Sequence, residues 1–190
     1  MMWGKLDIKV HQGKPTHASI KKNLPKGLYT VESSNDAIKP FNLVYVNTAH
    51  ATYKNAYVKN ASLEFGDAND TEGDLGIVEP RLIRTEGSSL LDINTVFATG
   101  AAVEITPCLV NELYWVRPAS LDGTSFTIGD KLKIAAGGTV EKLESNPSNP
   151  TSKHGHVFIA MENHTFNTSG VKTLLLVRYG GIQPYKIAGA

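Results

Sequence analysis

The stretch Phe126-Thr-Ile-Gly-Asp-Lys-Leu-Lys-Ile134 decides the fold class of this chain. Polar and apolar residues alternate along it, which is the period of a strand with one buried face. The residues expected on the buried face are Phe126, Ile128, Leu132 and Ile134. The next segment, Ala135-Ala-Gly-Gly-Thr139, contains the paired glycines that are typical of a tight turn between strands. The stretch therefore predicts a β-strand followed by a turn.

Similar segments flank this stretch on both sides. They are Leu113–Arg117, Val140–Leu143, Val157–Met161 and Thr173–Val177. Thr, Val, Asn and Gly are frequent throughout the chain, and Pro is scattered between the apolar segments, which favours strands and turns over long helices. We expect a mainly β protein in which residues 113–181 form a small β-barrel or β-sandwich.

The order of these features resembles that of head decoration proteins, also called cement proteins, of tailed bacteriophages. The resemblance rests on four features: Gly129-Asp130 before a strand, the Gly137-Gly138 turn, the Val157–Glu162 strand and the final Leu174–Arg178 strand. It covers residues 113–181, whereas residues 1–112 form a larger upstream region than the smallest members of that group need. The resemblance implies a protein without enzymatic activity that binds the outside of an assembled icosahedral capsid and clamps the major capsid protein subunits together.

Charge and hydropathy argue against several other classes of protein. The formal net charge of the 190 residues is +1, which offers no field to attract nucleic acid or an anionic membrane. Lys5, Asp7 and Lys9 interrupt the first ten residues, so we expect no secretory signal. The longest apolar runs, such as Val157–Met161, are far too short to span a bilayer. We expect a soluble protein that is made in the host cytoplasm and resides in the virion.

The chain divides into an N-terminal arm (1–26), a β-rich region (27–112), the decoration-like β-barrel (113–181) and a C-terminal tail (182–190). Strand candidates in the second region are Leu28–Glu32, Phe41–Asn47, Thr52–Lys59, Val78–Arg84 and Ala102–Cys108. The spacing of apolar residues in Ser88–Phe97 fits one short helix, and a strand is nearly as plausible. Glu144–Ser152 is expected to be a polar loop.

Two segments of opposite charge suggest self-association. Residues 1–40 contain seven lysines and three acidic residues, whereas Ser62–Glu79 contains six acidic residues and no Lys or Arg. Contact between the basic arm of one subunit and the acidic segment of a neighbour predicts a head-to-tail homo-oligomer, most naturally a trimer. Apolar and basic side chains of the arm are the expected partner-binding residues, namely Trp3, Lys5, Ile8 and Lys9.

Metal binding and cofactor binding are not expected. The acidic segment lacks the ligand spacing of an EF-hand, because Glu72 and Val78 occupy the sixth and twelfth positions counted from Asp67. His154, His156 and His164 lie close enough in sequence to meet a divalent ion, but no fourth ligand is evident, so surface or loop histidines are favoured. A site formed by His154 and His156 from three subunits remains an alternative. The single Cys108 excludes an internal disulfide.

Enzymatic activity is not expected either, because the chain contains no nucleophile elbow, phosphate-binding loop, dinucleotide-binding glycine pattern or His-Glu-x-x-His motif. A glycosidase pair such as Glu141 and Glu162 depends on a separation that sequence does not give. The main alternative to capsid decoration is a receptor-binding or glycan-binding β-module of a phage tail or fibre. A hydrolase with an unfamiliar β-fold ranks third.

Overall fold

The computed structural model describes residues 28–31, 37–47, 57–60, 74–85, 88–170 and 172–188. The described part of the upstream region contains β1 (Leu28–Val31), β2 (Leu43–Asn47), β3 (Tyr57–Asn60), β4 (Asp74–Val78), β5 (Arg81–Thr85), β6 (Ser88–Asp92) and β7 (Ala102–Pro107). The C-terminal half contains β8 (Leu113–Val116), β9 (Ser125–Phe126), β10 (Lys131–Ala135), η1 (Ala136–Gly138), β11 (Thr139–Lys142), β12 (Pro150–Ala160), β13 (His164–Thr165) and β14 (Leu175–Ala188). The prediction of a mainly β protein is confirmed.

The upstream strands close into a barrel in the order β1-β3-β2-β4-β7, with β7 returning to pair with β1. The β1–β3 pair is parallel, and the other pairs of this barrel are antiparallel. Its interior is filled by apolar side chains, most of which recur at alternate strand positions: Tyr29, Val31, Val44, Val46, Val78, Val103 and Ile105. Ile38 and Phe97, from the connecting segments, complete this core. We call this unit the upstream barrel.

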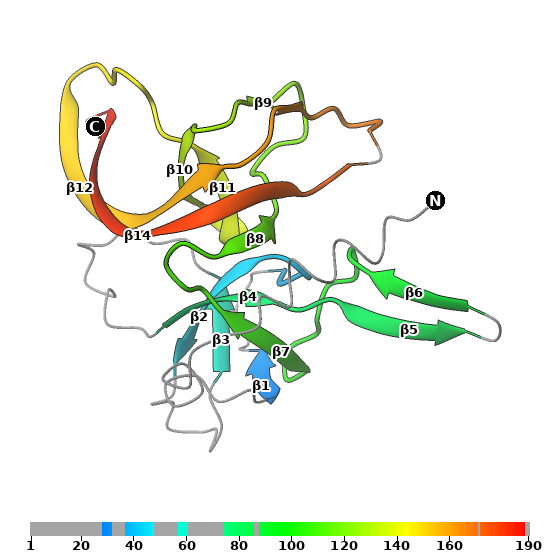
Figure 1. Cartoon of the computed structure of the whole chain (residues 1–190). Coiled ribbons are helices and arrows are strands. Elements are labelled where there is room, and N and C mark those ends of the chain that lie inside the picture. The colour runs from blue at the N-terminus through cyan, green and yellow to red at the C-terminus, as the bar shows by residue number, and fades with distance from the viewer. Residues whose placement is uncertain are drawn as a thin grey trace.

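The C-terminal strands form a curled antiparallel sheet in the order β11-β10-β12-β14-β8 (Figure 1). Two backbone hydrogen bonds join its edges: Val140 N donates to Arg117 O and Ala119 N donates to Val140 O, both at 2.8 Å. The short pair β9–β13 contributes Phe126. Phe166, which follows β13, packs edge-to-face against the ring of Phe126. The sheet therefore curls around its own core, in agreement with the barrel-like fold expected for this half of the chain.

The two units share one apolar cluster. In β2 and β4, side chains alternate between the inside of the upstream barrel and its outer surface. Leu43, Leu75 and Ile77 face outward and join the core of the C-terminal sheet, which includes Tyr114, Val116, Leu132, Val140, Phe158 and Leu175. Polar contacts cross the same boundary, because Asn42 Nδ2 donates to Gly137 O at 2.8 Å and Arg117 Nε donates to Pro40 O at 2.7 Å.

Two regions differ from the sequence-based expectations. Residues 88–92 form strand β6, which pairs with β5, rather than the short helix that was one of two alternatives. Residues 182–188, expected to belong to a tail, continue strand β14, and residues 150–152, expected in a loop, begin strand β12. The physical reason is that these two polar segments pair with each other, from Pro150↔Ala188 to His156↔Ile182.

Candidate docking surface

The predicted partner-binding residues Trp3, Lys5, Ile8 and Lys9 lie outside the described residues. The greater part of the acidic segment, residues 62–73, also lies outside them. The structure therefore neither places these residues together nor separates them. Two features of the β units themselves present side chains or backbone to solvent.

The first feature is a two-stranded extension of the C-terminal sheet, formed by Pro150–His156 of β12 and Ile182–Ala188 of β14; we call it the ribbon. The neighbouring strands do not follow it. β10 pairs with β12 only over Val157–Ile159, and β8 pairs with β14 only over Leu175–Arg178. Figure 1 shows the ribbon curling away from the rest of the sheet.

A β-bulge marks the base of the ribbon. The register between β12 and β14 shifts between His156 and Phe158, so that two residues of β14, Gly180 and Gly181, lie opposite Val157. Gly181 has a φ of 82°. A positive φ at this point favours glycine, and bulges of this kind bend a strand. Val110 packs next to Gly181 and is 58% exposed, and Ile182 is 51% exposed. Two large apolar side chains are thus presented to solvent where the ribbon begins.

The inner side of the bulge holds a buried polar contact. His156 is 8% exposed, and its Nδ1 lies 2.6 Å from the Tyr179 hydroxyl oxygen. The ring of Tyr45, from β2 of the upstream barrel, lies at a centroid distance of 5.7 Å from the imidazole. Burial lowers the pKa of His156 to about 4, so the ring is neutral at physiological pH.

The faces of the ribbon differ in composition. One face is exposed along its length, and its residues are Pro150, Ser152, His154, Pro184, Lys186 and Ala188. On the other face the side chain of Tyr185 lies across Gly155, where an added Cβ would stand 2.9 Å from the tyrosine hydroxyl. Lys153 and Lys186 are basic, and neither strand of the ribbon contains Asp or Glu. Each face of the ribbon therefore carries one lysine, Lys186 on the exposed face and Lys153 on the face of Tyr185.

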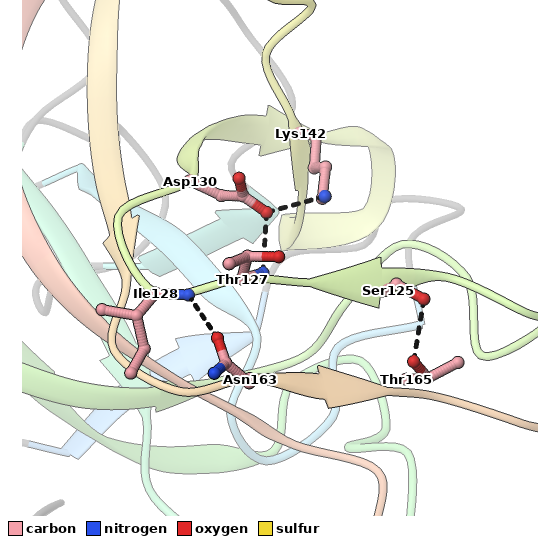
Figure 2. A network of polar contacts seen from close by, with 7 residues as sticks. All are labelled: Ser125, Thr127, Ile128, Asp130, Lys142, Asn163 and Thr165. Atoms are coloured by element: carbon pink, nitrogen blue, oxygen red, sulfur yellow. Dashed lines mark hydrogen bonds and ion pairs between the residues drawn. The ribbon is translucent and has the colours of Figure 1, made fainter.

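The second feature is the turn Thr127–Asp130, which presents Ile128 (Figure 2). Asp130 N donates to Thr127 O at 3.0 Å, and Gly129 has a φ of 93°, the positive value that a type II turn requires at its third residue. Ile128 is 59% exposed. The turn therefore exposes a large apolar side chain to solvent at its tip.

Three side chains, those of Asp130, Lys142 and Asn163, hold this turn in place (Figure 2). Asp130 Oδ2 accepts a hydrogen bond from Thr127 N at 2.8 Å and pairs with Lys142 Nζ at 2.7 Å. Asn163 Oδ1 accepts from Ile128 N at 2.8 Å. Although partial burial opposes ionisation, the hydrogen bonds from Lys142 and Thr127 and the charge of Lys142 lower the pKa of Asp130. The carboxylate therefore stays ionised and the turn stays fastened at neutral pH.

The candidate metal ligands have separate environments. His154 is exposed on the ribbon, His156 is buried against Tyr179, and His164 packs edge-on against Phe166 at a centroid distance of 4.5 Å. Within the described ranges, no group of three or more His, Cys, Asp or Glu side chains is placed to hold a metal ion. Cys108 packs against the core of the C-terminal sheet, and burial raises the pKa of its thiol.

Both candidate carboxylates make structural contacts. Glu141 pairs with Lys133, its cross-strand neighbour in β10, at 3.1 Å. Glu162 forms an ion pair with Lys172 and accepts a hydrogen bond from Leu176 N at 2.8 Å, which ties the end of β12 to β14. Each carboxylate therefore stabilises the C-terminal sheet locally.

Sequence reasoning missed the ribbon and the role of Ile128. The one available signal for the ribbon was the short alternation in Tyr185-Lys-Ile187, which the preceding Pro184 obscured because proline is rare inside sheets. Ile128 follows the same alternation as the core residues Phe126 and Leu132, and the turn at Gly129 is what directs it outward. Of the helices in the described part of the chain, none is long and apolar enough to cross a membrane.

Comparisons with protein-family models, with curated proteins and with solved structures found no match for this chain.

Proposed function

We propose that this protein is a structural virion protein that binds the outer surface of an assembled bacteriophage capsid and stabilises it. The observation that carries the proposal is the ribbon, a two-stranded extension of a well-packed β body. Among the described strands, none pairs with either edge of the ribbon. Uncovered strand edges pair readily with other chains, and proteins normally shield them. The resemblance of residues 113–181 to decoration proteins supports the same conclusion.

The described contacts support binding rather than catalysis. Exposed apolar residues stand on backbone that is held rigidly: Ile128 on a fastened turn, and Val110 and Ile182 beside a bulge. A side chain that is already ordered loses little entropy when it is buried by a partner. We therefore propose a non-enzymatic protein whose docking residues are held in place before binding.

The mechanism is preferential binding to the assembled shell. A protein that contacts two neighbouring subunits of the major capsid protein binds the assembled lattice and not the separated subunits, so each bound copy stabilises the lattice. Many weak contacts then add up, and self-association would strengthen attachment through multivalency. We propose a homotrimer, held in part by the basic arm and the acidic segment of adjacent subunits.

Co-sedimentation with tailed-phage capsid shells that have been stripped of accessory proteins tests the proposal. Binding that saturates at a fixed multiple of the lattice sites is the expected result. No binding to any of several shells would contradict it, and glycan-array binding by the isolated protein would then favour a receptor-binding module. Sedimentation velocity at low and high salt tests the trimer, which should dissociate as the charges are screened.

A further inference from the structure

Val110 stands at the tip of a fastened turn beside β14. Glu112 N donates to Leu109 O at 3.0 Å, which closes the turn Leu109–Glu112. Asn111, its third residue, has a φ of 72°, the positive value that a type II turn requires there and that asparagine tolerates. Asn111 N donates to Tyr179 O at 2.8 Å and Tyr179 N donates to Glu112 O at 3.0 Å, so the turn is tied to β14. The 58% exposed side chain of Val110 is therefore presented on backbone that is held in place.

Arg178 of β14 lies next to this turn, on the face of the C-terminal sheet that is opposite the core. Its neighbours in the chain, Val177 and Tyr179, belong to the core, and side chains alternate along a strand. The residues directly across from Arg178 are Leu113 on β8, which is 36% exposed, and Ile159 on β12. The nearest residues along the strands on this face are also uncharged, namely Trp115, Val157, Leu176 and Gly180. Arg178 is thus a cation among apolar neighbours.

The guanidinium of Arg178 has unused hydrogen-bond donors. Other cations of the sheet are paired, Lys133 with Glu141 and Lys172 with Glu162, whereas Arg178 forms no ion pair among the described residues. Its Nη1 donates to Asn111 Oδ1 at 3.4 Å, longer than the roughly 2.9 Å of a typical N–H···O hydrogen bond. Its Nε is buried and has no hydrogen-bond partner in the described part of the chain. An unpaired buried donor costs free energy, which an acceptor supplied by a binding partner would recover.

We infer that Val110, Leu113 and Arg178 form a binding site for a segment of a capsid subunit that carries an Asp or Glu side chain next to an apolar one; we call it the arginine site. The carboxylate would accept hydrogen bonds from the guanidinium, and the apolar side chain would contact Val110 and Leu113. Arginine and well-packed apolar anchors contribute most of the binding energy at many interfaces. The inference deepens the proposed function, on which it rests for the identity of the partner.

The surroundings of Arg178 favour a carboxylate over a phosphate. A planar guanidinium matches a carboxylate through two parallel N–H···O hydrogen bonds, and apolar neighbours strengthen such a pair because they exclude water. A phosphate group carries more charge and needs more than one cation close by. Lys131, on the same face, is separated from Arg178 by the intervening strand β12 and its residue Ile159.

The Nε–H signal of Arg178 in NMR spectra, assigned by its loss in Arg178→Lys, tests the site without a capsid. The blocked peptide acetyl-Leu-Glu-Leu-amide should shift this signal in a saturable manner. The isosteric acetyl-Leu-Gln-Leu-amide should bind at least about tenfold more weakly, because only a carboxylate accepts charge-assisted hydrogen bonds. No shift with either peptide, or equal binding of both, would overturn the inference. Tighter binding of inorganic phosphate than of the Glu peptide would overturn the carboxylate assignment.

Matched variants separate the arginine site from the charge of the sheet in general. Arg178→Gln and Lys131→Gln each remove one positive charge from the same face, and the backbone amide signals of Asn111 and Leu113 report peptide binding in both. Only Arg178→Gln should weaken binding of the Glu peptide by about tenfold or more. Equal losses in the two variants would overturn the inference.

Two further variants keep the test decisive. Val110→Ser leaves the guanidinium in place and should weaken peptide binding several-fold, because its apolar contact is lost. If Arg178→Gln unfolds by circular dichroism, Arg178→Lys replaces it, since lysine keeps the charge and loses the planar fork. Undiminished binding in Arg178→Lys would overturn the role of the fork. Shifts of these signals that grow with protein concentration alone would identify a second copy as the occupant and overturn the capsid segment.

Failure of this inference is distinguishable from failure of the proposed function. A wild-type protein that binds the Glu peptide at Arg178 but binds no shell contradicts capsid decoration and leaves the carboxylate site intact. A protein that saturates shells with the same affinity as wild type and as Arg178→Gln keeps its decoration role, and the arginine site is then not its means of attachment.

Discussion

The Nδ1 atom of His156 lies 2.6 Å from the hydroxyl oxygen of Tyr179, at the point where the ribbon leaves the C-terminal sheet. Tyr45 of the upstream barrel approaches the same imidazole, so this contact lies where β2, β12 and β14 meet. A charge placed on His156 would be buried at a junction of both units, and protonation should weaken that junction.

This arrangement predicts a specific loss of stability in acid. The pKa of His156 is about 4 in the folded protein, whereas an ordinary histidine has a pKa of 6.5. The stability that the neutral imidazole contributes is therefore complete above about pH 6.5 and is lost as pH falls toward 4. Between pH 7 and pH 5 the loss should be about 2 kcal/mol. Urea unfolding of wild type and His156→Gln at both pH values measures it.

The neighbouring His154 provides the matched control, because it is exposed on the same strand. His154→Gln should retain the pH dependence of the wild type, whereas His156→Gln should lose the part between pH 7 and pH 5. Identical pH dependence in His156→Gln and wild type would show that the buried imidazole does not govern acid stability.

A close approach inside the upstream barrel predicts a second effect. An added Cβ at Gly76 would collide with Ile105 Cγ2 and would stand 3.2 Å from Thr106 O on β7. Gly76→Ala should therefore destabilise the protein by about 1–3 kcal/mol through overpacking. Ile105→Leu removes the β-branched methyl group, so the double variant should recover part of the loss. Thermal unfolding of the single and double variants measures both, and additive losses would contradict the collision.

Arg117 joins the two units, and this predicts that lysine cannot replace it. Its guanidinium donates to Pro40 O and to Ile93 O, and burial lowers its pKa. A lysine ammonium lacks the fork that reaches two carbonyls, so Arg117→Lys should lose about 2 kcal/mol of unfolding free energy. Arg178→Lys is the control, because the hydrogen bond of Arg178 within the described ranges goes to the side chain of Asn111, at 3.4 Å, and not to two backbone carbonyls. Equal effects of the two variants in urea unfolding would argue against a clamp at Arg117.

The sequence predicted the β class and most strands of the C-terminal core because alternation was strong there, as in Lys131–Ile134. The single strand expected over Phe126–Ile134 is wrong, because the turn Thr127–Asp130 interrupts it and exposes Ile128. The sequence did not predict the ribbon, since pairing of Pro150–His156 with Ile182–Ala188 depends on partners far apart in the chain. Polar strands carry weak hydrophobic alternation, and Pro184 reads as a strand breaker unless its nitrogen is known to face outward. The buried environment of His156 was likewise invisible, because Tyr179 and Tyr45 approach it only in the folded protein.

The fastened turn at Ile128 predicts a change in binding without a change in stability, on the basis of the proposed function. Ile128 is 59% exposed, so Ile128→Ser should alter the unfolding free energy by less than about 0.5 kcal/mol. The same variant should weaken co-sedimentation with capsid shells about tenfold, because a buried apolar anchor at an interface contributes more than 1 kcal/mol.

Two further variants separate the side chain from the turn that holds it. Asn163→Ala removes the acceptor for Ile128 N, leaves the isoleucine in place and should produce an intermediate loss of shell binding as the turn loosens. Val96→Ser changes another large apolar residue, 45% exposed and outside this turn, and should bind as wild type does. Equal losses in Val96→Ser and Ile128→Ser would mean that surface hydrophobicity in general, and not this turn, governs attachment to the shell.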